Sequence, residues 1–100
     1  MSSVLAIAAS GMHAAQLRLE SSAHNTANLN TPGFHRQQVQ QQAAAAPGGV
    51  QAHIAQAPQA GVALEGEAVE QIAASYAFKA NALVLRSTQS MLGSLLDLHA

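Results

Sequence analysis

The sequence predicts a mainly α fold, in which two long terminal helices pair as a helical hairpin or coiled coil, with a small β-hairpin or extended segment between them. Three observations lead to this expectation. Small and apolar residues recur at helical spacing near both ends, the middle carries Pro- and Gly-containing turns, and much of the 49% hydrophobic content is alanine. Alanine favours helix but buries little area, so such helices are suited to completing their burial against other chains.

The N-terminal helix is expected within residues 1–30, because two columns of side chains repeat every seven residues there. The column of larger residues is Leu5, Met12, Leu19 and Thr26. The companion column of mostly small residues is Ala8, Ala15, Ser22 and Leu29. Ser2 or Ser3 can cap the start of the helix. We interpret Gly11 as a contact point for another backbone, since glycine otherwise weakens a helix.

The middle of the chain, residues 31–64, is expected to hold loops and a small β element. Its parts are a turn at Thr31, Pro32 and Gly33, strands over residues 34–41 and 50–56, and a hairpin turn over residues 46–49. Pro32 disfavours helix at the residue before it, and Gly33 can adopt positive φ, so the first helix ends here. Residues 40–46 lean helical in propensity, and their assignment stays open.

The C-terminal helix is expected over residues 65–100, and the chain as a whole is expected to form one domain. Glutamates cluster at the helix start and Lys79 and Arg86 follow, the order that the helix dipole favours. A stripe of apolar and small residues runs along the first part: Val69, Ala73, Tyr76, Ala80 and Leu83. It then shifts register to Val84, Thr88, Met91, Leu95 and Leu98. We expect the helices to pair and to leave a strip free.

Composition and charge argue against several classes of function. With 4 Lys and Arg residues and a formal net charge of -1, the chain lacks a basic surface for nucleic acid. The apolar run from Val4 to Ala9 is too short to span a bilayer, so no membrane insertion is expected. There is no cysteine, and Asp97 is the only aspartate, so neither thiol chemistry nor a Ser/His/Asp grouping is indicated. We expect neither enzyme activity nor a cofactor.

Five histidines raise the question of a metal site. They are His13, His24, His35, His53 and His99. No pair of them has the HxxxH or HxH spacing that places two imidazoles on one metal ion, and cysteine ligands are absent. We therefore expect scattered surface histidines and no metal.

Two segments, one at each end of the chain, carry a family resemblance. The first, "ASGMHAAQLRLESSAHNTANLNTPGFHR", combines a Ser-Gly pair, spaced asparagines and a Thr-x-Gly-Phe turn. The second, "VEQIAASYAFKANALVLRSTQSMLGSLLDL", contains an Ala-Phe-x-Ala-Asn core and a Met-Leu tail. Together they resemble the signatures of the bacterial flagellar basal-body rod and hook proteins, most closely the small proximal rod subunits. His24, His35, Tyr76 and Lys79 depart from the family pattern, and the connection over residues 59–65 is shorter than is typical.

The resemblance implies a structural axial subunit of the flagellar basal body rod. Such a subunit is synthesised in the cytoplasm, exported through the flagellar type III apparatus to the periplasmic rod and assembled through its terminal helices. The implied partners are other rod and hook subunits, further copies of the chain and the export apparatus. The residues expected at helix–helix contacts are Leu5, Met12, Leu19, Leu83, Met91 and Leu95.

Asparagines near the end of the first helix are unusual, because their amides compete for backbone hydrogen bonds. Taken alone, they would only fray and cap the helix. In a wall of alanine and leucine helices a buried amide must find a partner, so it would fix the register between helices. The asparagines expected in this role are Asn25, Asn28 and Asn81, with Asn81 as a partner on the opposite helix.

The alternative is a small secreted helical-hairpin adaptor or effector that acts as a dimer. A chain of 100 residues suits the WXG-type secreted proteins, but it has no tryptophan, and Thr31-Pro32-Gly33 is not their turn. A discrete dimer that ignores rod proteins would favour this alternative. Concentration-dependent filaments would favour the axial subunit.

Overall fold

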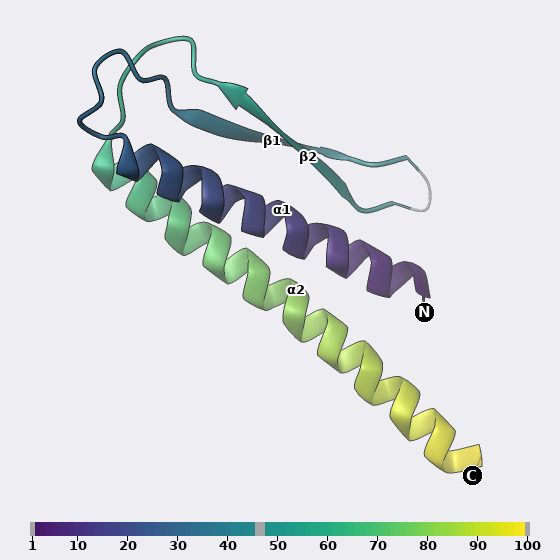
Figure 1. The fold of residues 1–100 in the computed structure, drawn as a ribbon. Helices are drawn as coiled ribbons and strands as arrows, with labels where there is room; N and C mark the ends of the chain where they lie inside the picture. The colour runs from purple at the N-terminus through teal and green to yellow at the C-terminus, as the bar shows by residue number, and fades with distance from the viewer. Residues whose placement is uncertain (1, 46–47, 100) are drawn as a thin grey trace.

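The computed structural model describes residues 2–45 and 48–99, with the backbone alone at Ser2, Leu98 and His99. The elements are helix α1 (Ser2–Ala27), strands β1 (Gln37–Ala43) and β2 (Val50–Gln56), and helix α2 (Leu64–His99). They form an elongated molecule of 63 × 25 × 13 Å (Figure 1). The predicted mainly helical fold, with two long helices and a small β-hairpin between them, is confirmed.

Helices α1 and α2 run side by side in opposite directions, and small side chains line their contact (Figure 1). The buried residues of the companion column on α1 are Ala8, Ala15 and Ser22. Those on α2 are Glu67 and Ala74, seven residues apart, and Thr88, fourteen residues after Ala74. Residues seven apart lie on one face of a helix, so each helix presents a narrow face of small or polar residues to the other. The larger side chains lie beside or opposite this contact.

Alanine makes up the buried apolar core of the described residues. Its members are Ala8, Ala14, Ala15, Ala57 and Ala74. No leucine, isoleucine, valine or methionine reaches the same burial in the part of the chain that the structure describes. Because hydrophobic stabilisation scales with the apolar area removed from water, such a core stabilises a single chain only modestly.

The close approach of the two helices is tightest at Gly11. A Cβ placed on Gly11 would lie 2.5 Å from Oδ1 of Asn81 on α2. A larger residue at position 11 would therefore have to displace the Asn81 side chain of the opposite helix. The sequence had suggested a contact with another backbone at Gly11, and in this chain the contact is with an amide side chain.

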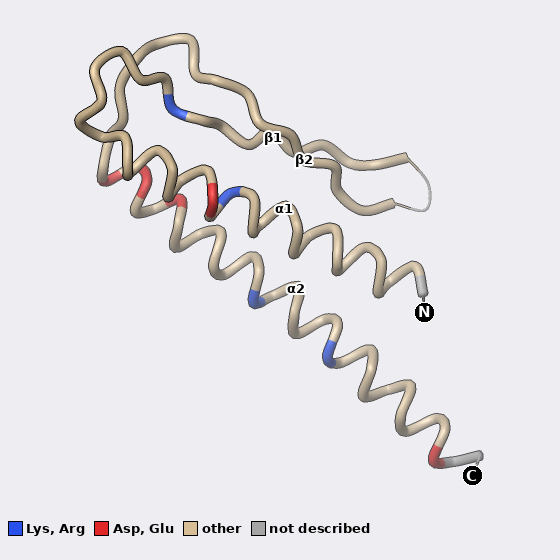
Figure 2. Tube along the Cα trace, viewed as in Figure 1, with Lys and Arg blue, Asp and Glu red and all other residues tan. Residues whose placement is uncertain are grey.

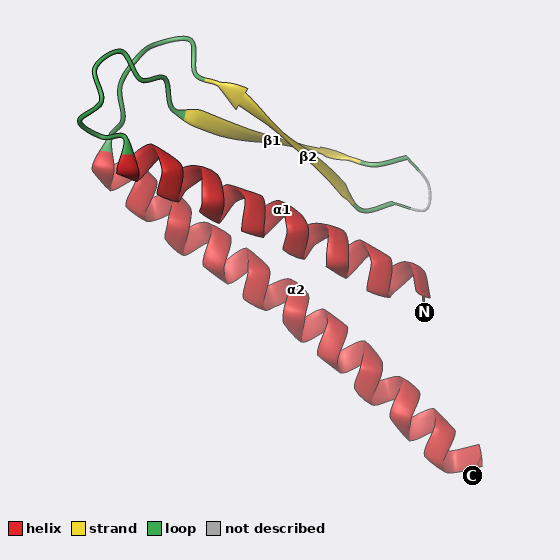
Figure 3. Cartoon of the chain, viewed as in Figure 1, coloured by secondary structure: helices red, strands yellow, loops and turns green. Residues whose placement is uncertain are grey.

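The β-hairpin lies on α1, on the side away from α2 (Figure 3). Its strands pair antiparallel from Gln37 opposite Gln56 to Ala43 opposite Val50. Val39, Val50, Ala52 and Ile54 share one face of the hairpin, and Val50 and Ala52 of this face border α1. The glutamines at positions 38, 40, 42 and 51 occupy the outer face with His53. The alternation expected from residues 50–56 therefore sets which face meets the helix.

Strand β1 continues to Ala43, so most of the run at residues 40–46, whose helical propensity left it open, forms a strand. The hairpin turn is fastened to α1: the Val50 N–H donates to Oγ of Ser10 at 3.0 Å. Gly48 and Gly49 have φ of 103° and 101°, a conformation that favours glycine. The remaining residues of the predicted turn, Ala46 and Pro47, lie outside the described residues.

Helix α1 ends at Ala27, and residues 28–30 form a hydrogen-bonded turn. The Thr31 N–H donates to the carbonyl of Asn28 at 3.0 Å, and Gly33 has φ of 73°. The predicted turn residues Thr31, Pro32 and Gly33 are exposed at this corner. The turn reverses the chain so that β1 starts above the helix it has just left.

Candidate functional site

A buried polar cluster holds α1, β1 and α2 together at the end where the two helices meet. Asn25 and Glu67 are each 1% exposed. The Asn25 amide group donates to the carbonyl of Gln37 at 2.9 Å and to Oε1 of Glu67 at 3.2 Å, and its oxygen accepts from the Gln37 N–H at 2.6 Å. One asparagine therefore joins both helices to the first residue of the hairpin.

Arg36 supplies the positive charge of this cluster. Its Nε donates to Oε2 of Glu67 at 3.0 Å, and the Glu67 side chain is almost fully enclosed. Burial alone raises the pKa of Glu67, but the hydrogen bonds from Arg36, Asn25 and Ser22, together with the charge of Arg36, outweigh it. The pKa of Glu67 is therefore below its ordinary value, and the buried carboxylate is ionised at neutral pH.

Further polar contacts continue the cluster along the helix pair. Ser22 donates to the backbone carbonyl of Glu67 at 3.1 Å. The Gln71 amide donates to Oγ of Ser22 at 3.2 Å, and Arg18 forms an ion pair with Glu70. Because each contact requires a specific geometry, the cluster defines the axial position of α1 relative to α2.

The three asparagines predicted to set register have different surroundings. Asn25 lies at the centre of the polar cluster, but its partners are Gln37 and Glu67, not Asn81. Asn28 donates to the carbonyl of His24 at 2.9 Å and accepts from Thr31, so within this chain it caps the helix end. Asn81 donates to the carbonyl of Ala77 at 2.9 Å and lies against Gly11. Whether any of them sets register between subunits stays a prediction.

The sequence interpretation missed Glu67, Arg36 and Ser22 as members of one site. Glu67 had been grouped with its neighbouring glutamates as a charge at a helix start. The available signal was its seven-residue spacing to Ala74 and Asn81, which places all three on one face of α2. Arg36 follows a turn, and the sequence offers no signal that it reaches α2.

The residues predicted at helix–helix contacts divide into two groups. Leu5, Met12 and Leu19 are half-buried along one flank of α1, and Leu19 lines a groove with Ile72 and Tyr76 of α2. Leu83, Met91 and Leu95 lie on α2 and are exposed. Their contacts with other chains therefore remain predictions.

The last part of α2 extends beyond the start of α1 (Figure 1). Gly11 lies against Asn81, and α1 begins nine residues before Gly11, so α1 starts opposite about Ser90. The residues after this point include Met91, Leu95 and Leu96, which are 58%, 47% and 70% exposed. We call residues 91–97 the overhang. Its apolar side chains have no partner from α1.

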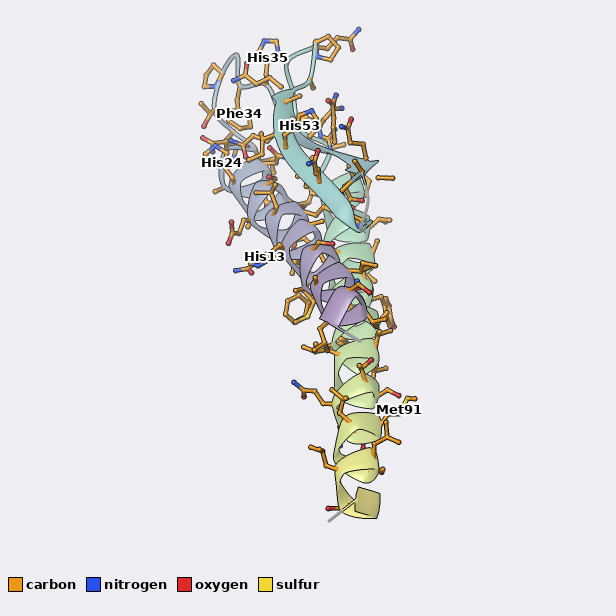
Figure 4. All side chains as sticks on the ribbon, turned by 90° about the vertical axis from the view of Figure 1, so that its right-hand side faces the viewer. His13, His24, Phe34, His35, His53 and Met91 are labelled. Carbon is orange, nitrogen blue, oxygen red and sulfur yellow. The ribbon has the colours of Figure 1, made fainter. Side chains whose placement is uncertain are left out.

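Charged and metal-ligating side chains are sparse. Acidic residues gather where α1 and α2 meet, and Lys79 and Arg86 lie farther along α2 (Figure 2). His24 packs against Phe34 with ring centroids 5.5 Å apart, and His13, His35 and His53 lie apart from one another (Figure 4). Among the described residues, no three His, Cys, Asp or Glu side chains gather where they could hold a metal ion.

One known protein family matches part of the chain. Residues 5–35 match the family model of the flagella basal body rod protein. The match supports a rod-family protein. The matched segment contains Ala8, Ala15, Ser22 and Asn25, which are the α1 side of the helix contact and of the polar cluster. No curated protein matches the chain.

The rod family has a structural role in the basal body of the flagellum, and this family-level match supports the same role for the chain. The family is structural rather than enzymatic. Rod proteins assemble with other rod subunits, so the match supports other rod subunits as partners of this chain. Neither described helix is long and apolar enough to cross a membrane.

Proposed function

We propose that the chain is an axial subunit of the flagellar basal body rod that packs its two terminal helices against those of neighbouring rod subunits. The rod-family match over residues 5–35 supports the structural role. The observation that carries the assembly proposal is the overhang of α2, whose apolar side chains are exposed in the single chain. In this proposal they become buried between subunits.

The flank of α1 supplies the second contact. Leu5, Met12 and Leu19 lie seven residues apart on one side of α1, outside the alanine contact with α2. The polar cluster around Asn25 and Glu67 holds α1 and α2 at a fixed axial offset. We infer that it presents the flank and the overhang to neighbours as one rigid unit, so that Asn25 acts on register indirectly.

We also propose that the subunit reaches the periplasmic rod through the flagellar type III export apparatus, as an unfolded chain. The alanine core supports this step, because it buries little apolar area and gives the isolated chain modest stability. The larger hydrophobic side chains contribute once neighbours cover them. Folding is then completed by assembly.

Co-assembly with rod subunits tests the proposal. Leu95→Glu places a charge in the overhang, and Ser94→Glu places the same charge on the adjacent exposed residue as a matched control. We expect Leu95→Glu to abolish co-sedimentation with rod subunits and rescue of swimming in cells that lack the native chain, while Ser94→Glu retains both. Normal assembly by Leu95→Glu would contradict the proposal.

Size-exclusion chromatography of the chain, alone and mixed with rod subunits, separates the rod role from the alternative. Filaments or mixed oligomers that grow with concentration support the axial subunit. A species that never associates with rod subunits at any concentration would favour the secreted adaptor.

A further inference from the structure

A second apolar surface lies on α2, outside the buried contact with α1, and its members Ile72 and Tyr76 border the groove that Leu19 of α1 also lines. Its members are Val69, Ile72, Tyr76 and Leu83, which are 58% to 69% exposed. Their spacing of three, four and seven residues places them on one face of the helix. We call this set the outer stripe. A contiguous exposed apolar patch on a soluble protein marks an interaction surface.

The outer stripe is apolar over only part of the helix. Beyond Leu83 the same helical positions are taken by Ser87, Ser90 and Ser94, all exposed. A partner helix that followed α2 along its whole length in parallel would meet these serines. The stripe therefore fits a partner that overlaps only the first two-thirds of α2.

The stripe and its flanking charges are arranged symmetrically around Tyr76. Val69 and Leu83 lie seven residues before and after Tyr76, and Ile72 and Ala80 lie four before and after it. The charges continue the symmetry with opposite sign, since Glu65 lies eleven residues before Tyr76 and Arg86 ten after it. A half-turn about Tyr76 thus exchanges apolar with apolar positions and brings Glu65 within one residue of the position of Arg86, whereas Lys79 corresponds to the uncharged Ala73.

The charges at the two ends of the stripe are exposed and lack ion-pair partners. The ion pairs among the described residues are Arg18 with Glu70 and Arg36 with Glu67, which leave Glu65 and Arg86 unpaired. Lys79 lies on the same flank, with Nζ 5.9 Å from the centre of its own Tyr76 ring. Both end charges are therefore available to a partner of opposite charge.

We propose that the outer stripe is a two-fold interface, in which two copies of this chain pack their α2 helices antiparallel and cross at Tyr76. Val69 then lies against Leu83 of the partner subunit, and Glu65 lies beside Arg86 of the partner subunit, twice per dimer. Such an interface is isologous, because the same patch serves both copies.

The end of the apolar stripe agrees with this arrangement. Leu64 begins α2 twelve residues before Tyr76, so the overlap of the two copies ends about twelve residues after it, at Thr88. The serine positions begin at Ser87, next to the end of the partner helix. In a parallel pair Glu65 would instead face Glu65 of the partner subunit, and serines would line the far half of the contact.

The contact is small, so the dimer is expected to be reversible. The stripe from Val69 to Leu83 is about 21 Å long, and one helix pair of this length buries less area than a standard stable interface. The dimer forms from the pure chain without any rod protein, so the inference is independent of the rod role. If no dimer is found, the proposal that the overhang contacts rod subunits still stands.

Charge reversal tests the antiparallel register. We expect sedimentation velocity of the full chain to show a monomer–dimer equilibrium over about a thousandfold concentration range. Glu65→Arg and Arg86→Glu should each weaken the dimer about tenfold, because each turns two attractive pairs into repulsive ones. The double variant should recover the original affinity. Circular dichroism checks that these exposed substitutions leave the helices intact.

Cross-linking tests the position of the two-fold axis, and the absence of native cysteine makes the result unambiguous. Under mild oxidation, Tyr76→Cys should form a disulfide dimer, whereas Val69→Cys alone should not. A mixture of Val69→Cys and Leu83→Cys chains should cross-link to each other. A chain that stays monomeric throughout, a double charge variant that fails to recover, or efficient cross-linking of Val69→Cys to itself would overturn the proposal.

Discussion

The two ends of the helix pair are built in opposite ways. Where the chain turns from α1 to α2, Asn25 and Glu67 are buried, and Glu67 accepts hydrogen bonds from both Asn25 and Arg36. At the other end, apolar side chains are exposed beyond the start of α1, among them Met91, which Figure 4 labels, and Leu96. The usual distribution of polar and apolar residues is reversed. The single chain is held by specific short contacts, and in the proposed assembly its exposed hydrophobic surface is buried against other chains.

The largest effect is expected when the buried carboxylate of Glu67 is removed from the polar end of the helix pair. Glu67→Ala should lower the free energy of unfolding by about 2–3 kcal/mol, because the hydrogen-bonded groups of Arg36 and Asn25 lose a charged partner. Urea unfolding followed by helical circular dichroism measures the change. Glu65→Ala, an exposed glutamate two residues earlier, is the matched control and should have little effect on stability. Equal losses in both variants would contradict the central position of the cluster.

A smaller loss of stability at the same end of the helix pair is expected when the pH is lowered. The folded-state pKa of Glu67 lies below the ordinary value of 4.5, so its contribution is fully present above about pH 4.5 and is lost as the pH falls through the folded pKa. Urea midpoints measured from neutral pH to about pH 3 should decline more steeply for the native chain than for Glu67→Gln. The difference is smaller than for Glu67→Ala, since a protonated carboxyl still forms hydrogen bonds. Parallel declines would remove Glu67 as the group responsible.

Gly11 tests the middle of the helix pair. Alanine normally stabilises a helix relative to glycine, but here its Cβ would collide with the Asn81 amide. We expect Gly11→Ala to lower the free energy of unfolding by about 1 kcal/mol, as in other overpacked contacts. Combining it with Asn81→Ala should recover the loss in the same urea assay. A Gly11→Ala chain more stable than the native one would show that the Asn81 amide moves aside without cost.

The smallest effect on stability is expected in the overhang. Leu96→Ser removes a large apolar side chain that is 70% exposed, so the free energy of unfolding of the single chain should change by less than about 0.5 kcal/mol. A thermal unfolding scan at low concentration, where no dimer forms, measures it. A large loss would mean that the overhang contributes to the fold of one chain, and the contrast between the two ends would disappear.

The sequence predicted the two helices and the hairpin, because long periodic segments and Pro-Gly turns are local signals. The companion column of Ala8, Ala15 and Ser22 also proved to be the buried face of α1. The α2 stripe from Val69 to Leu83 was recognised, but periodicity states only which residues share a face. It does not state which face meets α1, and the small residues around Ala74 take that place because they allow closer packing.

The polar cluster could not be predicted from local sequence patterns, for a different reason. Asn25 was singled out by its unusual position near a helix end, but its partners lie far along the chain. Arg36 reaches Glu67 only because the turn at Gly33 folds β1 back over α1. The sequence around Arg36 and Glu67 does not indicate that the two side chains are in contact. Contacts between distant segments need the fold before they can be assigned.

The alanine core has a further consequence for how the chain responds to temperature. Exposure of apolar surface is the main source of the heat capacity increment of unfolding, usually roughly 12–15 cal/mol/K per residue. Since alanines are the only buried apolar residues among those described, we expect the increment per residue to be below this range. The stability curve of a single subunit is then broad and shallow, and melting is gradual. The free energy of unfolding of such a protein decreases little on cooling.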